Sequence, residues 1–139
     1  MDAAEARATV SSMYGGTLRR VRFDGLELIS LTVGATWWLD RCSFVGTDLR
    51  QATLDRVSLR MCDLRNADLR GASLRGTLLG GCDLRGADLR DADLTGAQLT
   101  AVNTGRDDVG RTDVTGSRLE GAVLTDVTAE GVRGWPGRV

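Results

Sequence analysis

Apolar residues recur along this chain with a period of five. Leucine occupies every fifth position from Leu49 to Leu99, eleven times without a break. A helix places apolar residues about every 3.6 positions and a strand places them at every second position, so neither element fits. A period of five therefore indicates a structural repeat. The frame continues upstream at Phe44 and downstream at Val109, Val114, Leu119 and Leu124, with Thr104 as an irregular member.

The residues around each leucine also follow a pattern. A small residue lies two positions before it, an Asp often directly before it, an Arg often directly after it, and a Gly often next. In a short extended stretch, the small residue and the leucine face the same side, and glycine eases the turn that follows. Repetition of this unit predicts a chain that coils around an axis, each coil stacked on the last. The small positions are Cys42, Thr47, Ala52, Val57, Cys62, Ala67, Ala72, Thr77, Cys82, Ala87, Ala92 and Ala97.

Two of these units, Ala67-Asp68-Leu69-Arg70-Gly71 and Ala87-Asp88-Leu89-Arg90-Asp91, carry the motif Ala-Asp-Leu-x-x in full. From residue 42 to residue 126 the chain resembles the pentapeptide repeat family, whose consensus is Ala-Asp/Asn-Leu-x-x. The resemblance implies an all-β solenoid, a right-handed quadrilateral β-helix of about five coils with four pentapeptides in each. Leucine and the small residue would then fill the interior, and the other three positions would face solvent.

The three cysteines support a four-sided coil. Cys42, Cys62 and Cys82 are spaced by twenty residues, so four pentapeptides per coil would stack them on one side of the interior. The same spacing predicts Val102 and then Ala122 as the next members of this column.

Upstream of Phe44 the frame is kept only after a slip of one residue. Leu18, Phe23, Leu28, Val33 and Trp38 are spaced by five, whereas the step from Trp38 to Phe44 is six. We therefore expect an extra residue near 39–43, as a bulge or corner distortion. The inward positions before these residues are large here, which indicates a wider or irregular coil. This frame turns several apolar residues outward: Ile29, Trp37 and Leu39 in the shifted part, and Val45, Met61 and Leu78 in the regular part.

The two ends lack the repeat. Residues 2–13 have helix-forming composition with acidic residues at the start, and a short N-terminal capping helix would cover the apolar end of the solenoid. Trp135 and Pro136 could close the other end. The expected organisation is a cap at 1–16, the β-helix at 17–128 (irregular at 17–43, regular at 44–128) and a C-terminal cap or tail at 129–139.

Composition narrows the chemistry. The chain has 18 basic and 19 acidic residues, no histidine and, by inspection, no lysine. The commonest general base and metal ligand is therefore missing, as is the lysine of Schiff-base or P-loop chemistry. Three parallel thiols do not converge into the tetrahedral set that zinc requires. We expect no catalytic residue, no metal and no cofactor, and the absence of a visible signal peptide or membrane-length apolar run favours a cytoplasmic protein.

Charged residues form columns on one predicted face. Stacked like charges repel, and a neighbouring column of opposite sign offsets this repulsion. The columns are either a solvated face with weak ion pairs or an ordered surface for a protein partner. A patch around Trp37 is either an interface or covered by the N-terminal segment. The candidate interaction surface comprises Asp48, Asp68, Asp88, Asp108, Arg50, Arg70, Arg90 and Trp37.

Three functions remain open. The first is a non-catalytic scaffold that presents its surface to a protein partner, as a monomer or a homodimer, without direct contact to nucleic acid or membrane. The second follows from the resemblance, because some pentapeptide repeat proteins mimic DNA and protect DNA gyrase and topoisomerase IV from quinolones or natural gyrase poisons. Mimicry needs a strongly negative surface, whereas residues 47–100 contain eight Asp and eight Arg. The third is an enzyme or accessory factor in a biosynthetic pathway, with Trp37, Trp38 and Asp40 as the residues to examine.

Overall fold

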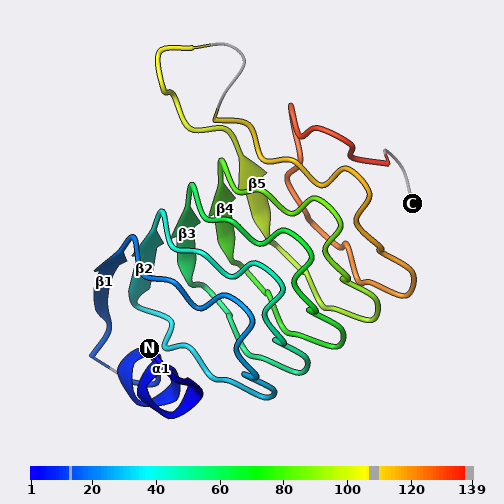
Figure 1. Cartoon of the computed structure of the whole chain (residues 1–139). Helices are drawn as coiled ribbons and strands as arrows, with labels where there is room; N and C mark the ends of the chain where they lie inside the picture. Colours follow the sequence, from blue (N-terminus) through cyan, green and yellow to red (C-terminus); the bar gives the residue numbers. More distant parts are fainter. Residues whose placement is uncertain (13, 107–109, 137–139) are drawn as a thin grey trace.

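The computed structural model describes residues 1–12, 14–106 and 110–136, which form one short helix and a stack of coils (Figure 1). Five parallel strands form one sheet in the order β1-β2-β3-β4-β5. One strand comes from each successive coil, so the expected all-β solenoid with an N-terminal helix is confirmed. The elements are α1 (Ala3–Val10), β1 (Gly16–Arg19), β2 (Trp37–Asp40), β3 (Ser58–Arg60), β4 (Leu78–Gly80) and β5 (Gln98–Thr100).

Each coil has four sides. The strands make up the first, which we call the sheet face. Parallel bridges between residues twenty apart define the other three. The cysteine face contains the bridge Asp63↔Asp83, the Asp–Arg face contains Asp68↔Asp88, and the fourth face contains Ser73↔Asp93. Parallel bridges between coils thus recur once per pentapeptide, which confirms the quadrilateral β-helix.

The predicted inward positions form the core. Every leucine of the series from Leu49 to Leu99 is buried, and Leu69 is 0 % exposed. The small positions are buried beside them, including the three cysteines, which stack as expected up to Cys82. Thr47 and Thr77 are buried at small positions because each hydroxyl donates to a carbonyl of the preceding coil, those of Phe23 and Leu54.

The expected register between residues 34 and 43 is wrong. Leu18 pairs with Leu39, so Leu39 faces the core at 1 % exposure, whereas Trp38 faces solvent at 59 %. The six-residue step lies between Val33 and Leu39, before the predicted site at 39–43. A turn closed by the Trp37 N–H and the Gly34 carbonyl, 3.1 Å between N and O, absorbs the extra residue.

The predicted orientation of Trp37 is also wrong, because its side chain is buried and does not face outward. Its indole Nε1 donates to the Ser12 carbonyl at 3.1 Å, and its ring lies against Gly16 and Gly34. Two adjacent tryptophans satisfy the five-residue frame about equally, and packing beneath the N-terminal segment decides between them. Ile29 and Leu78 are outward as predicted, at 40 % and 37 % exposure, while Val45 and Met61 are half-buried.

Helix α1 covers the first coil. Asp2 caps it by accepting from the Glu5 N–H at 2.8 Å, and Ala6 and Val10 are buried against the core. The Arg7 guanidinium donates to the Ile29 carbonyl at 2.9 Å, so it satisfies a backbone group of the first coil that no preceding coil could reach. No helix among the described residues is long and apolar enough to cross a membrane.

A ten-residue insertion follows β5. Bridges change from a spacing of twenty to a spacing of thirty, as in Asp83↔Asp113 and Gln98↔Thr128. Residues 101–106 leave the stack as a projecting segment (Figure 1, yellow), and its base is closed by a hydrogen bond from the Val102 N–H to the Gly110 carbonyl at 2.7 Å.

The insertion overturns the predicted column after Cys82. Thr112, not Val102, continues the cysteine column, and its Oγ1 donates to the Leu79 carbonyl. Ala122 follows Ala92 on the fourth face, because Asp93 bridges Val123. Ten residues are two pentapeptides, so the apolar frame survives the insertion while the chain changes face. Val114 is inward as expected, Thr104 is exposed, and Val109 lies outside the described residues.

The last coil is only partly covered. Its inward residues Leu119, Leu124 and Val127 pack against the core but are half-buried. Trp135 packs beside them, and Pro136 lines a shallow hollow with Leu119.

Candidate interaction surface

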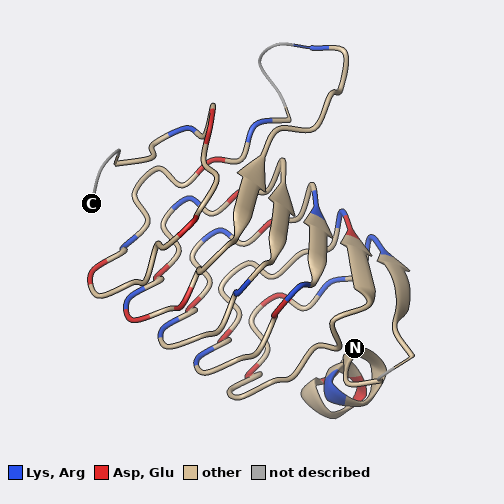
Figure 2. Cartoon of the chain, turned by 180° about the vertical axis from the view of Figure 1, so that it is seen from behind, with Lys and Arg blue, Asp and Glu red and all other residues tan. Residues whose placement is uncertain are grey.

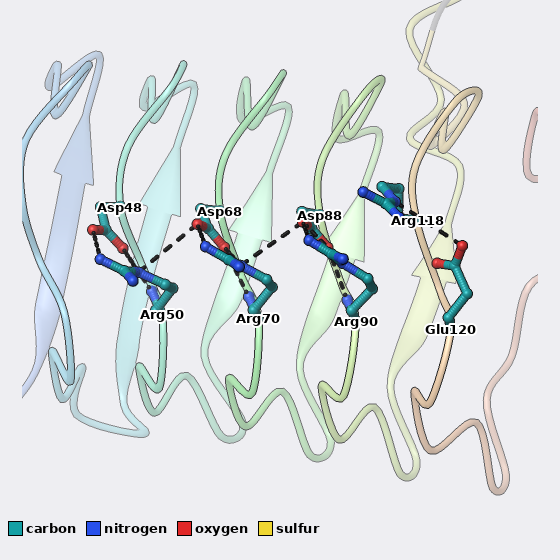
Figure 3. Close-up of polar contacts among 8 residues, drawn as sticks. All are labelled: Asp48, Arg50, Asp68, Arg70, Asp88, Arg90, Arg118 and Glu120. Atoms are coloured by element: carbon teal, nitrogen blue, oxygen red, sulfur yellow. Dashed lines mark hydrogen bonds and ion pairs between the residues drawn. The ribbon is translucent and has the colours of Figure 1, made fainter.

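Three Asp–Arg pairs lie in register on the Asp–Arg face (Figure 3). Each aspartate precedes and each arginine follows an inward leucine, so both side chains project from the same side of the coil. In the Asp68–Arg70 pair, Nε is 2.9 Å from Oδ1 and Nη2 is 2.7 Å from Oδ2. Each aspartate also accepts from the backbone N–H of its arginine at 3.2 Å. The other two pairs, Asp48–Arg50 and Asp88–Arg90, have the same geometry.

The pairs are linked along the stack. Arg50 Nε lies 3.8 Å from Asp68 Oδ2, and Arg70 Nε lies 3.8 Å from Asp88 Oδ2. Each of these guanidiniums therefore contacts the carboxylate of its own repeat and that of the next coil, so opposite charges alternate along the stack (Figure 3). We call this row of six residues, from Asp48 to Arg90, the Asp–Arg ladder.

Contacts within the ladder shift the pKa values of Asp48, Arg70 and Asp88. The hydrogen bond from Arg50 lowers the pKa of Asp48, and that from Arg90 lowers the pKa of Asp88. Reciprocally, the hydrogen bond to Asp68 raises the pKa of Arg70. Asp48, Arg70 and Asp88 therefore remain charged across the neutral range.

The ladder ends in a reversed pair. Asp88 bridges Arg118, so an arginine occupies the position where a spacing of twenty placed Asp108. Arg118 Nε lies 4.0 Å from Glu120 Oε1 (Figure 3), with the order of charges inverted. Asp108 lies outside the described residues. Trp37, the remaining member of the predicted surface, is buried beneath the N-terminal segment and does not belong to it.

The cysteine face carries a second, shorter ladder that sequence reasoning did not single out. Arg65 and Arg85 bind Asp63 and Asp83 with Nη2–Oδ2 distances of 2.7 Å. Arg65 Nε lies 3.9 Å from Asp83 Oδ2. The signal was present in the sequence, since both repeats contain the same Asp-Leu-Arg triplet as the Asp–Arg face.

No metal site is apparent on either face. Within residues 1–12, 14–106 and 110–136, no group of three or more His, Cys, Asp or Glu side chains could hold a metal ion. The thiols are buried and free, and the Cys62 and Cys82 sulfurs donate to the carbonyls of Leu39 and Leu59 at 3.1 and 3.3 Å.

The repeats match a known family. The family model described as pentapeptide repeats matches residues 39–71 and 67–103, with eight copies. This chain carries the repeats of the pentapeptide repeat family. The matched residues are the regular coils, including the whole Asp–Arg ladder. A search of curated protein sequences found no match.

Solved structures of pentapeptide repeat proteins resemble this chain to different degrees. A pentapeptide repeat protein from the thylakoid lumen of Arabidopsis thaliana superimposes with a TM-score of 0.57 at 28 % identity, covering 73 % of this chain and 74 % of that one. QnrB1, a plasmid-mediated fluoroquinolone resistance protein, gives 0.47 at 19 % identity, covering 84 % and 64 %. Rfr23 from the cyanobacterium Cyanothece gives 0.42 at 20 %, covering 84 % and 90 %.

Proposed function

We propose that this pentapeptide-repeat chain is a non-catalytic scaffold that binds a protein partner through the Asp–Arg face. The observation that carries the proposal is the Asp–Arg ladder, in which six half-exposed charged side chains are held in register by bidentate bonds. Long side chains normally lose rotamer entropy when an interface forms. Here the ladder has ordered them in advance, so a partner would bind a surface already arranged.

The ladder keeps hydrogen-bonding capacity for a partner. A guanidinium has donors on Nε and on both terminal nitrogens, and the aspartates use Nε and Nη2. Among the described residues, no hydrogen bond engages Nη1 of Arg50, Arg70 or Arg90. A partner with carboxylates or carbonyls about 4.8 Å apart, the spacing of neighbouring strands, would match these free donors.

The same pairing argues against DNA mimicry on this face. A surface that replaces DNA must present unneutralised negative charge to a site built for phosphates. Each aspartate of the ladder is already bound by an arginine of its own repeat. The gyrase hypothesis predicts that the purified protein changes DNA supercoiling by gyrase, with or without a fluoroquinolone. The scaffold proposal expects no change at low micromolar protein.

The direct test inverts one pair of the ladder without changing net charge. The double variant Asp68→Arg with Arg70→Asp reverses the charges in the middle of the face. The fold tolerates this order, because Arg118 and Glu120 show it at the equivalent position. We expect partners captured from native cells with the tagged wild-type chain to fall at least about tenfold in yield, as measured by quantitative mass spectrometry.

The matched control is the same inversion on the cysteine face, Asp63→Arg with Arg65→Asp. It changes the same residue types in the same geometry, and we expect the captured partners to be retained. Equal retention by both variants would refute the assignment of binding to the Asp–Arg face. Thermal unfolding of both variants verifies that each remains folded.

A further inference from the structure

Another charged surface lies at the N-terminal corner of the sheet face. Arg19 ends β1, Arg20 follows it, Arg41 follows β2, and Arg60 ends β3. Figure 2 shows these positions as blue segments at the ends of neighbouring strands. We call the four arginines, together with the exposed Trp38, the basic corner.

The basic corner, unlike the Asp–Arg face, is not neutralised. Arg41 and Arg60 both donate to Asp40 at 3.1 Å, so one carboxylate serves two guanidiniums. Within the part of the chain that the structure describes, Arg19 and Arg20 form no ion pair. Four arginines against one aspartate leave an excess of three positive charges on a chain whose net charge is −1.

The excess is confined to three coils. The positions that Arg19, Asp40 and Arg60 occupy on β1–β3 hold Gly80 on β4 and Thr100 on β5. Two spacings of about 4.8 Å separate β1 from β3, so the charged strip is about 10 Å long. An extended peptide advances about 3.3 Å per residue, and about three residues would span it.

An exposed aromatic side chain lies beside the strip. Trp38 is 59 % exposed, whereas the other residues at its level on β1 and β3 are Thr17 and Ser58. A shallow hollow is lined by Thr17, Arg19, Trp38, Asp40, Ser58 and Arg60. The hollow therefore combines one aromatic ring with two arginines and one aspartate.

We propose that the basic corner binds a short acidic segment of a protein partner, in extended conformation. Carboxylates of the segment pair with Arg19 and Arg60, and an apolar side chain between them lies on Trp38. Arginine and tryptophan are the residues that most often dominate binding energy at protein interfaces. The inference rests on the proposed scaffold function only in that the partner is a protein, since it concerns a different face.

The short length of the strip favours a peptide over a nucleic acid. Nucleic-acid affinity grows with the number of phosphates neutralised, and a strand running beyond three coils would meet Gly80 and Thr100 instead of arginines. A short peptide places all of its charge on the strip, and its apolar side chain makes use of Trp38.

The test is selection of a phage-displayed library of random nine-residue peptides on the purified chain. We expect enriched peptides to carry two or more Asp or Glu residues around an apolar one. A synthetic copy of the most enriched peptide, labelled with fluorescein, is then titrated by fluorescence anisotropy. Its affinity should fall at least about tenfold for Arg19→Gln with Arg60→Gln, severalfold for Trp38→Ser, and on raising NaCl from about 50 to about 300 mM.

The control variant Arg65→Gln with Arg85→Gln removes the same charge from the cysteine face and should keep affinity within about twofold. Enrichment of peptides without acidic residues, or equal loss for both charge variants, overturns the proposal. So does tighter binding of a twelve-nucleotide single-stranded DNA that depends on Arg19 and Arg60. None of these results bears on the charge inversion at Asp68 and Arg70, so failure of either proposal is recognised separately.

Discussion

The corner residue of each pentapeptide from Gly46 to Gly96 adopts a left-handed backbone conformation. Glycine holds this position at Gly71, Gly76 and Gly86, with φ between +64° and +70°. Other residues hold it too, as at Arg56, where φ is +61°. A side chain in this region costs about 1 kcal/mol because Cβ approaches the backbone. The repeat geometry thus imposes the conformation whatever the residue.

The stacked pair Gly76 and Arg56 tests this cost in both directions. A Cβ at Gly76 would meet only Arg56 Cγ, at 3.5 Å, which is an ordinary contact. Gly76→Ala should therefore lower the free energy of unfolding by about 1 kcal/mol through backbone conformation alone. Chemical denaturation measures this loss as a lower denaturant concentration at the unfolding midpoint, with an unchanged m-value.

Arg56→Gly should act in the opposite sense. Removal of the side chain relieves the left-handed conformation, while the freer unfolded chain offsets part of the gain. We expect a net change of about 0 to +1 kcal/mol in the free energy of unfolding. A clear destabilisation would mean that the Arg56 side chain contributes more through its contacts than its backbone conformation costs.

The buried thiols make a third prediction at this scale. The contact with Cys62, and then burial, raise the pKa of Cys42 above its ordinary range. Because the thiolate is the reactive form, the native protein should not react with Ellman's reagent at pH 8. The same protein in guanidinium chloride should release close to one equivalent for each of its three cysteines. Rapid reaction of the native protein would show that the column opens.

At the scale of one element, a coil is stabilised by its inward leucines. Leu69 is fully buried between the coils before and after it. Leu69→Ala should lower the free energy of unfolding by about 2–5 kcal/mol, through lost burial and the cavity that remains. The control is Ile29→Ala, which removes a branched side chain that is 40 % exposed and should cost less than about 1 kcal/mol. Similar losses for the two would contradict the inward assignment of Leu69.

The insertion after β5 and the turn before β2 show what the five-residue pattern cannot predict. The insertion at 101–110 preserves the five-residue frame, so the frame alone cannot reveal that Thr112 replaces Val102 in the cysteine column. What distinguishes the two is that Thr112 can donate to the Leu79 carbonyl. At the other end, packing against the N-terminal segment decides between Trp37 and Trp38, and no local pattern encodes that contact.

Across the whole molecule, the regular coils and their charged columns were predictable because both depend on position within the repeat. An aspartate and an arginine flanking an inward leucine must project together, as Asp68 and Arg70 do. The arginine could bind the aspartate of its own repeat or that of the next coil. The choice depends on the length and conformation of the side chain, which the pattern does not specify. The basic corner was not predictable for a different reason. It depends on Arg19, Asp40 and Arg60 meeting across coils that the shifted register had misaligned.

The ladder also predicts how stability of the whole molecule depends on pH. In the folded chain, Arg50 and Arg90 lower the pKa values of Asp48 and Asp88. In the unfolded chain, the pKa of an aspartate is about 3.9. A lowered folded pKa stabilises the protein above the unfolded value, and this contribution is lost as pH falls through the folded one. The denaturation midpoint should therefore be nearly constant from about pH 6 to 8 and fall below about pH 4.

The variant Asp48→Asn with Asp88→Asn isolates this contribution. It should be less stable than wild type at pH 7, and the difference should shrink as the pH falls, because wild type then loses the same two charges. Asp126→Asn, which changes an exposed corner residue, should track wild type throughout. Parallel curves for wild type and the double variant would mean that the ladder orders the surface without stabilising the fold. In that case its contribution would be confined to preorganising the face for a partner.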